Sequence, residues 1–175
     1  MMTGLFTALI AVGAFIRVPV PVCPFTLQFL FTTLAGLLLG ARQGAAAAFI
    51  YVLLGLAGLP IFTSGGGIGY VLQPTFGYLI GFILGAYVTG VIAHSGVLSM
   101  KRLLCACFAG LIVVYALGMV YYFAASRLWL GEPIGVWPLF LYCFLLAVPG
   151  DIALCIMSAV LGKRLIPLTK MRRAV

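Results

Sequence analysis

The fold is decided by the stretch Gln43–Met100, which reads QGAAAAFIYVLLGLAGLPIFTSGGGIGYVLQPTFGYLIGFILGAYVTGVIAHSGVLSM. These 58 residues contain no Lys, Arg, Asp or Glu. A helix needs roughly 20 apolar residues to cross the hydrocarbon core of a bilayer. Because every backbone N–H and C=O must be paired inside lipid, helices are the default spanning structure. The stretch therefore predicts two membrane-spanning helices and the loop between them.

The rest of the chain has the same character. Of its 175 residues 65% are hydrophobic and only 7% are charged, and its mean hydropathy is +1.30. A soluble domain carries about 25% charged residues. No stretch is polar enough for a separate soluble domain, so we predict one transmembrane domain, residues 1–175. Its fold class is an all-α bundle of six transmembrane helices, expected at Met2–Ile16, Phe25–Ala41, Gly44–Leu59, Thr75–His94, Leu103–Ser126 and Pro138–Leu165.

The basic residues predict the orientation of the bundle. Cytoplasmic segments of membrane proteins are enriched in Lys and Arg. With the N-terminus inside, the outer loops hold only Arg17 and Arg127, and we therefore expect both termini in the cytoplasm. The net charge of +8 is interpreted as topology signals and anchors to anionic lipid, not as a nucleic-acid surface. The inner segments hold Arg42, Lys101, Arg102, Lys163, Arg164, Lys170, Arg172 and Arg173.

Neither a leader peptide nor a metal site is expected. The first span has no basic n-region and no small-residue cleavage site, and Arg17-Val18-Pro19 follows it, so we interpret it as a mature helix. The chain has five cysteines in no C-x-x-C pattern and a single histidine, His94. Cysteines in such spans pack as small apolar side chains. We predict no metal and no cofactor.

Two outer loops stand out. The first, Arg17–Pro24, contains three prolines and is expected to be stiff. The second, Gly58–Pro74, is long and uncharged, and loops of this length are usually functional or disordered. Its aromatic and aliphatic residues argue against disorder. We expect it to fold back over the outer mouth of the bundle, where Ile61, Phe62, Tyr70 and Val71 can cover an apolar ligand.

Small residues recur four positions apart in several spans. This spacing lets helix backbones approach closely in lipid. Gly77, Gly81, Gly85 and Thr89 form such a series in the fourth span, which favours packing within the bundle. In the first span, docking to a partner subunit competes with internal packing. The residues concerned there are Gly4 with Ala8 and Thr7 with Ala11.

Asp151 is the outstanding candidate for a functional residue. It is expected near the middle of the sixth span, after Pro149-Gly150, whereas the only other acid, Glu132, falls in an outer loop. A charge at the bilayer centre costs about 2.5–3.5 kcal/mol on insertion scales and is a functional hypothesis by default. Pro149 removes a backbone hydrogen bond and is expected to loosen the helix there.

The remaining polar residues favour binding over catalysis. The chain shows no paired acids, no Ser–His–Asp set and no metal cluster, so it is not predicted to be an enzyme. A ligand pocket needs only an apolar cavity with aromatic walls and a few placed polar groups. Side chains that can supply such groups are Thr26, Gln28, Tyr70, Gln73, Tyr78, Tyr121, Tyr122, Tyr142 and Asp151.

Several segments together resemble one family. Pro24-Phe-Thr-Leu-Gln28, entered through a proline-rich run, is similar to a signature of the BioY family, the biotin-specific S components of energy-coupling factor (ECF) transporters. The resemblance continues in family order and spacing over nearly the whole chain. The further segments are Ala35-Gly-Leu-Leu-Leu-Gly-Ala-Arg-Gln-Gly44, Leu54-Gly-Leu-Ala-Gly-Leu-Pro-Ile-Phe62, Gln73-Pro-Thr-Phe-Gly-Tyr-Leu-Ile-Gly-Phe82 and Pro149-Gly-Asp151.

The resemblance implies a substrate-capture subunit of a bacterial plasma membrane. Such a subunit binds biotin near the outer face and works with a transmembrane coupling subunit and two ATPase subunits. The small residues Gly4, Ala8 and Ala11 would then form the coupling contact. The family usually has a lysine one helical turn after the aspartate, but this sequence has Leu154. Arg17 and Arg127 are the only outer cations, and Arg17 is therefore added to the candidate ligand-binding residues.

Three alternatives remain open at this point. The chain can be an S component for another vitamin or for a biotin precursor, which the loss of the lysine at position 154 allows. A structural membrane protein without a ligand is disfavoured by the intramembrane acid, and a membrane enzyme is disfavoured by the missing catalytic set. Biotin suits Asp151 because its ureido ring offers two N–H donors and its other ring is apolar.

Overall fold

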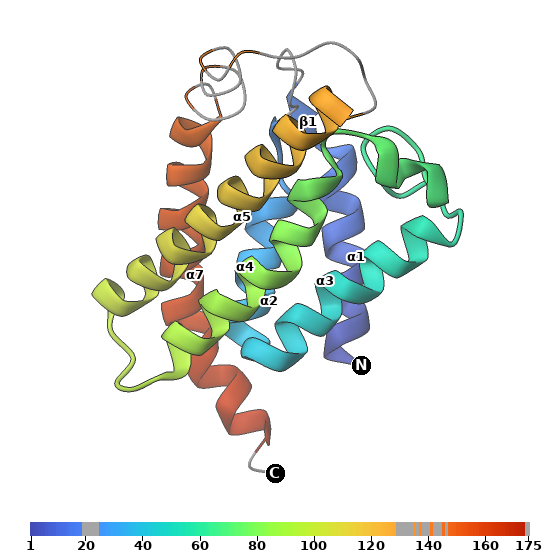
Figure 1. The fold of residues 1–175 in the computed structure, drawn as a ribbon. Coiled ribbons are helices and arrows are strands. Elements are labelled where there is room, and N and C mark those ends of the chain that lie inside the picture. The colour runs from blue at the N-terminus through green and yellow to red at the C-terminus, as the bar shows by residue number, and fades with distance from the viewer. Residues whose placement is uncertain are drawn as a thin grey trace.

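The computed structural model describes residues 1–18, 25–128 and 147–173, together with the single positions 135, 137, 141 and 145. Six α-helices form one bundle in this part of the chain, which confirms the predicted all-helical class (Figure 1). A 3₁₀ helix, η1 (Ile68–Leu72), and two short strands, β1 (Arg17–Val18) and β2 (Phe25–Thr26), lie in the loops. The helices are α1 (Met2–Phe15), α2 (Gln28–Leu39), α3 (Ala41–Leu56), α4 (Phe76–His94), α5 (Met100–Leu128) and α7 (Val148–Arg173).

The helices differ more in length than the predicted spans do. Within the described ranges, α4 and α5 are the two helices that are both long and apolar enough to cross a membrane by length and composition. Helices α1, α2 and α3 are apolar but have only 14, 12 and 16 residues. At 1.5 Å per residue α2 rises about 18 Å, well short of a hydrocarbon core of about 30 Å.

Two local features explain why α2 is short and why α3 begins early. The residues Phe25 and Thr26, predicted as the start of the second span, instead form strand β2, which pairs with β1 in the antiparallel sense. Gly40 then ends α2 with φ +88°, a left-handed conformation that favours glycine, and α3 begins at the next residue. Arg42, predicted in a turn between helices, therefore lies in the first turn of α3.

The glycine series of the fourth span forms the contact between α4 and α5, as predicted. A methyl group placed on Gly81 would lie 2.9 Å from Val114 Cα, and one on Gly85 would lie 2.8 Å from Val114 Cγ2. The Thr89 hydroxyl, in the same series, donates to the Ala106 carbonyl at 3.2 Å. Small side chains are needed here because the two backbones touch directly.

Helix α1 packs through one side and leaves the other open. The Thr7 hydroxyl donates to the Ala47 carbonyl on α3 at 3.0 Å, and Thr7 is buried. On the opposite side Gly4 and Ala8 are exposed, and a methyl group on Gly4 would meet nothing within 4 Å. Ala11 is half-buried. The face that the sequence predicts for partner docking is therefore not covered by this chain's described residues.

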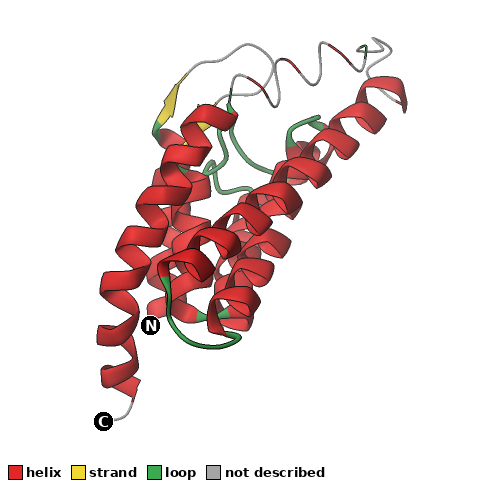
Figure 2. Cartoon of the chain, turned by 90° about the vertical axis from the view of Figure 1, so that its left-hand side faces the viewer, coloured by secondary structure: helices red, strands yellow, loops and turns green. Residues whose placement is uncertain are grey.

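The connections are divided between the two ends of the bundle. In Figures 1 and 2 the start of α1 and the end of α7 lie at one end, while β1, β2 and the loop before α4 lie at the other. The long loop between α3 and α4 folds back over the bundle at this second end, as predicted for Gly58–Pro74. This end carries the cavity described next.

Candidate functional site

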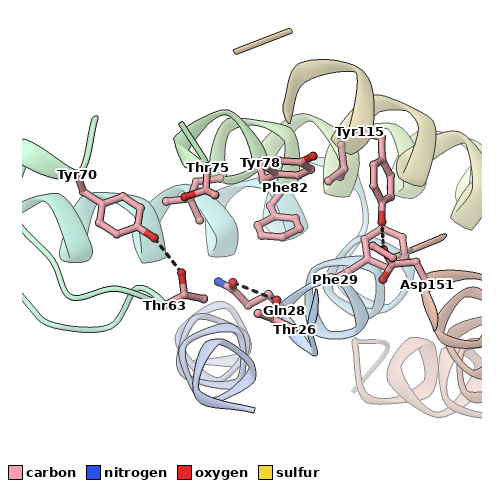
Figure 3. Close-up of a pocket in the computed structure, with 13 residues that line it drawn as sticks. Thr26, Gln28, Phe29, Thr63, Tyr70, Thr75, Tyr78, Phe82, Tyr115 and Asp151 are labelled. Atoms are coloured by element: carbon pink, nitrogen blue, oxygen red, sulfur yellow. Dashed lines mark hydrogen bonds between the residues drawn. The ribbon is translucent and has the colours of Figure 1, made fainter. Parts of the chain in front are cut away.

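A cavity opens under the loops, between α2, α4, α5 and the start of α7 (Figure 3). Measured out to its open mouth, and so including solvent space, it has a volume of about 630 Å³. Pockets for small organic ligands combine apolar walls with a few placed polar groups. The lining follows that pattern and consists of Thr26, Gln28, Phe29, Thr63, Tyr70, Thr75, Tyr78, Leu79, Phe82, Val114, Tyr115, Ala147 and Asp151.

Asp151 lies at the cavity wall, but not in the middle of a helix. The sequence places it near the centre of the sixth span, whereas the structure places it in the first turn of α7. Pro149 falls in the same turn, where a helix needs no backbone N–H from it, so it does not interrupt the helix as expected. The partial positive charge at a helix N-terminus favours a carboxylate at this position. Residues 138–140, the start of the predicted span, lie outside the described residues.

The Asp151 carboxyl is buried and hydrogen-bonded. Its side chain is 7% exposed, and Oδ2 accepts a hydrogen bond from the Tyr115 hydroxyl on α5 at 2.5 Å, drawn as a dashed line in Figure 3. In the described part of the chain Asp151 has no ion pair. Leu154, one turn further along α7, is itself buried in the apolar core. Tyr115 thus supplies a hydrogen bond to an acid that has no cation beside it among the described residues.

Gln28 is held by a chain of three hydrogen bonds. The Tyr51 hydroxyl donates to the Ile61 carbonyl at 3.0 Å, and a carbonyl can only accept. Tyr51 must therefore accept from Gln28, whose Nε2 lies 2.7 Å from the Tyr51 oxygen. The opposite end of the amide, Oε1, lies 3.3 Å from the Thr26 hydroxyl. This network sets which end of the Gln28 amide faces Thr26 and the cavity.

The long loop is anchored by Phe62. This ring is 2% exposed and packs edge-on against Tyr51, with 5.4 Å between centroids, and in a tilted arrangement against Tyr70, with 4.5 Å between centroids. It lies over Gly55 of α3, where any added Cβ would overlap the ring. Phe62 is thus an anchor beneath the loop and, contrary to expectation, does not line the cavity.

The two outer loops are joined near the cavity mouth. The Thr63 hydroxyl is 2.9 Å from the Tyr70 hydroxyl, and both residues line the cavity. Arg17 Nη1, from the first loop, donates to the Thr63 carbonyl at 2.6 Å, although Arg17 does not itself belong to the lining. Tyr121 on α5 donates to the Val71 carbonyl, which ties the loop to a third element.

The structure brings together five of the predicted ligand-binding residues. Gln73 is exposed at the end of η1 and falls outside the lining, as do Tyr121 and Tyr122. Tyr142 lies outside the described residues. Sequence reasoning missed Tyr115, because no spacing along the chain relates it to Asp151. The five that line the cavity are Thr26, Gln28, Tyr70, Tyr78 and Asp151.

The arrangement suits binding without chemical change. Phe29, Leu79, Phe82 and Val114 give apolar walls, while the hydroxyls and the Asp151 carboxyl give acceptors at separate points of the surface. Among the residues that the structure describes, no group of three His, Cys, Asp or Glu side chains is placed to hold a metal ion.

Comparison with known proteins agrees with these observations. The model of the BioY family matches residues 1–171. A probable biotin transporter BioY of Lysinibacillus sphaericus is 46% identical over 175 residues, which cover 99% of this chain and 89% of the relative. The biotin transporter BioY of Thermotoga maritima is 48% identical over 117 residues, covering 66% of this chain and 69% of the relative.

A solved structure agrees with the fold as well. The crystal structure of the S-component for biotin from an ECF-type ABC transporter superposes with a TM-score of 0.80 and 25% sequence identity. The match covers 94% of this chain and 88% of that structure. The sequence matches and the fold lead to the same assignment. This chain belongs to the BioY family.

Proposed function

We propose that this chain is the biotin-capture subunit of an ECF-type vitamin-uptake transporter in a bacterial plasma membrane. The observation that carries the proposal is the cavity, which combines apolar walls with a buried carboxyl in a BioY-family bundle. The subunit binds and presents its ligand and is not an enzyme.

The chemistry of biotin fits this cavity. Its fused ring system is largely apolar, and its ureido group carries two N–H donors and one carbonyl acceptor. The Asp151 carboxyl accepts an N–H group, while Phe29 and Phe82 cover apolar surface. A buried site that bonds an N–H group rejects analogues without that group, because its own acceptor would then be left unpaired.

The orientation follows from the charges and the shape of the bundle. Both termini face the cytoplasm, since eight basic residues then lie inside and two outside. The start of α1 and the end of α7 lie at the same end of the bundle in Figure 1. All six helices cross, and the bilayer thins around the short ones. The cavity then opens outward. The exposed Gly4 and Ala8, with the half-buried Ala11, form the contact for the coupling subunit, which works with two ATPase subunits.

Equilibrium binding of labelled biotin to the purified chain in detergent tests the proposal. We expect saturable binding that Asp151→Asn weakens by roughly 1.5–3 kcal/mol, the range for hydrogen bonds to charged groups. Asp151→Leu should weaken it at least as much, because the ligand loses its acceptor and the buried Tyr115 hydroxyl loses the carboxyl to which it donates. If the parent protein does not bind biotin but binds another vitamin or a biotin precursor, it is an S component for that other ligand, the alternative that Leu154 allows.

A further inference from the structure

The two oxygens of the Asp151 carboxyl have different surroundings. Oδ2 accepts the hydrogen bond from Tyr115, whereas Oδ1 has no hydrogen-bond partner among the described residues. Within the same ranges, the Ser158 hydroxyl is the one fully buried side-chain polar atom that lacks a hydrogen-bond partner. Because Oδ1 also lacks a partner but is not fully buried, part of its surface is accessible. Since Asp151 lines the cavity, the accessible surface of this oxygen faces the ligand space.

Tyr115 is well placed to hold the carboxyl in this orientation. Its side chain is 4% exposed, and its ring packs edge-on against Tyr78 with 6.0 Å between centroids. A packed ring has few rotamers, so its hydroxyl stays where the helix puts it. The bond to Oδ2 connects α5 to α7 and occupies one of the two carboxyl oxygens. The other oxygen is left to face the ligand.

We propose that Tyr115 is a positioning and specificity residue that makes Asp151 a receptor for a single N–H group of the ligand. Its hydroxyl occupies Oδ2 and leaves Oδ1 for one of the two ureido N–H groups. The two N–H groups of a cyclic urea diverge, so one carboxyl oxygen serves only one of them. The other N–H group meets a different acceptor. This inference rests on the proposed function, because it describes how the same cavity recognises biotin.

The proposal also orients the ligand. In its ionised form the Asp151 carboxyl, which has no cation beside it in the described structure, repels the carboxylate of biotin's side chain. The ring system therefore lies against Asp151, and the side chain runs away from it.

The test combines protein variants with two analogues of biotin, each methylated on one of the ureido nitrogens. Affinities are measured for the parent, Tyr115→Phe, Asp151→Ala and the double variant. We expect Tyr115→Phe to weaken biotin by about tenfold, the effect of losing one charge-assisted hydrogen bond. Adding Tyr115→Phe to Asp151→Ala should change little further, because residues that act through one another are not additive.

The analogues separate positioning from simple support of the fold. One analogue, methylated where Asp151 binds, should become insensitive to both substitutions, while the other should keep the full loss. Tyr121→Phe is the matched control, since it removes a tyrosine hydroxyl on the same helix that bonds the Val71 carbonyl instead. It should affect all three ligands equally. The infrared carboxyl band of Asp151, identified by its absence in Asp151→Ala, should shift in Tyr115→Phe and not in Tyr121→Phe.

Two results would overturn the inference while leaving the function intact. In the first, Tyr115→Phe and Asp151→Ala weaken binding additively. In the second, they act equally on both methylated analogues. A parent protein that binds no biotin at all would instead refute the proposed function.

Discussion

Replacing Phe62 by alanine removes the anchor that holds the Gly58–Pro74 loop on the bundle. The ring is almost fully buried and lies over Gly55, between the rings of Tyr51 and Tyr70. Truncating a buried phenylalanine costs about 3–5 kcal/mol. The two ring contacts account for roughly 0.5–1.5 kcal/mol each of that sum.

This loss of free energy should weaken the docking of the loop rather than the stability of the helices. The cost of undocking the loop is mainly the exposure of this one ring to water. A loss of 3 kcal/mol lowers the ratio of docked to undocked loop by about a hundredfold or more. Because Thr63 and Tyr70 line the cavity from this loop, the apparent biotin affinity should fall in proportion to the docked fraction.

Limited proteolysis of the loop, with and without biotin, measures this directly. When opening is fast relative to cleavage, the cleavage rate follows the open population, so Phe62→Ala should be cut much faster than the parent. Biotin should protect both proteins. Ile68→Ala is the matched control, because Ile68 belongs to the same loop but is 75% exposed. Equal cleavage rates and equal affinities in the parent and Phe62→Ala would refute the anchoring role.

Three further predictions use other parts of the molecule. Gly81→Ala should destabilise the bundle by about 1–3 kcal/mol, because its methyl group meets the Val114 backbone, whereas Gly4→Ala should not; melting in detergent compares them. A cysteine introduced by Ser95→Cys should react only with reagents supplied from the cytoplasmic side, and labelling from outside would contradict the proposed orientation. Ala8→Trp should leave biotin binding unchanged but reduce co-purification with the coupling subunit, and unchanged uptake would place that subunit elsewhere.

Much of the helical framework can be predicted from the sequence because a bilayer imposes one-dimensional rules. Each span must be a continuous apolar run, so α4 (Phe76–His94) agrees closely with the predicted Thr75–His94. Close approach of helix backbones also needs small residues at fixed spacing, so it was predictable that this span packs within the bundle, although only the structure shows that Gly81 and Gly85 contact α5. The position of the glycine-rich loop Gly58–Pro74 at one end of the bundle, between two predicted spans, follows from the same pattern.

The site depends on relations that have no one-dimensional signature. The sequence indicates that Asp151 matters, but only the fold places it in the first turn of α7 and brings Tyr115, 36 residues away, to its Oδ2. Which side chains meet across helices depends on the rotation and tilt of each helix. Those are set by packing in three dimensions, and a spacing rule within one helix carries no information about them.

The rotation and tilt of the helices also decide which of the predicted ligand-binding residues reach the cavity. Gln28 and Tyr78 reach the cavity because their helices turn those faces inward, whereas Gln73, which is equally polar, is exposed. Phe62 was expected to cover the ligand, but its ring packs over Gly55, where there is no side chain, and does not line the cavity. The sequence by itself determined that the chain belongs in lipid, that it is helical and which acid is buried. The tertiary structure decided which side chains face that acid, because contacts between helices are a property of their packing.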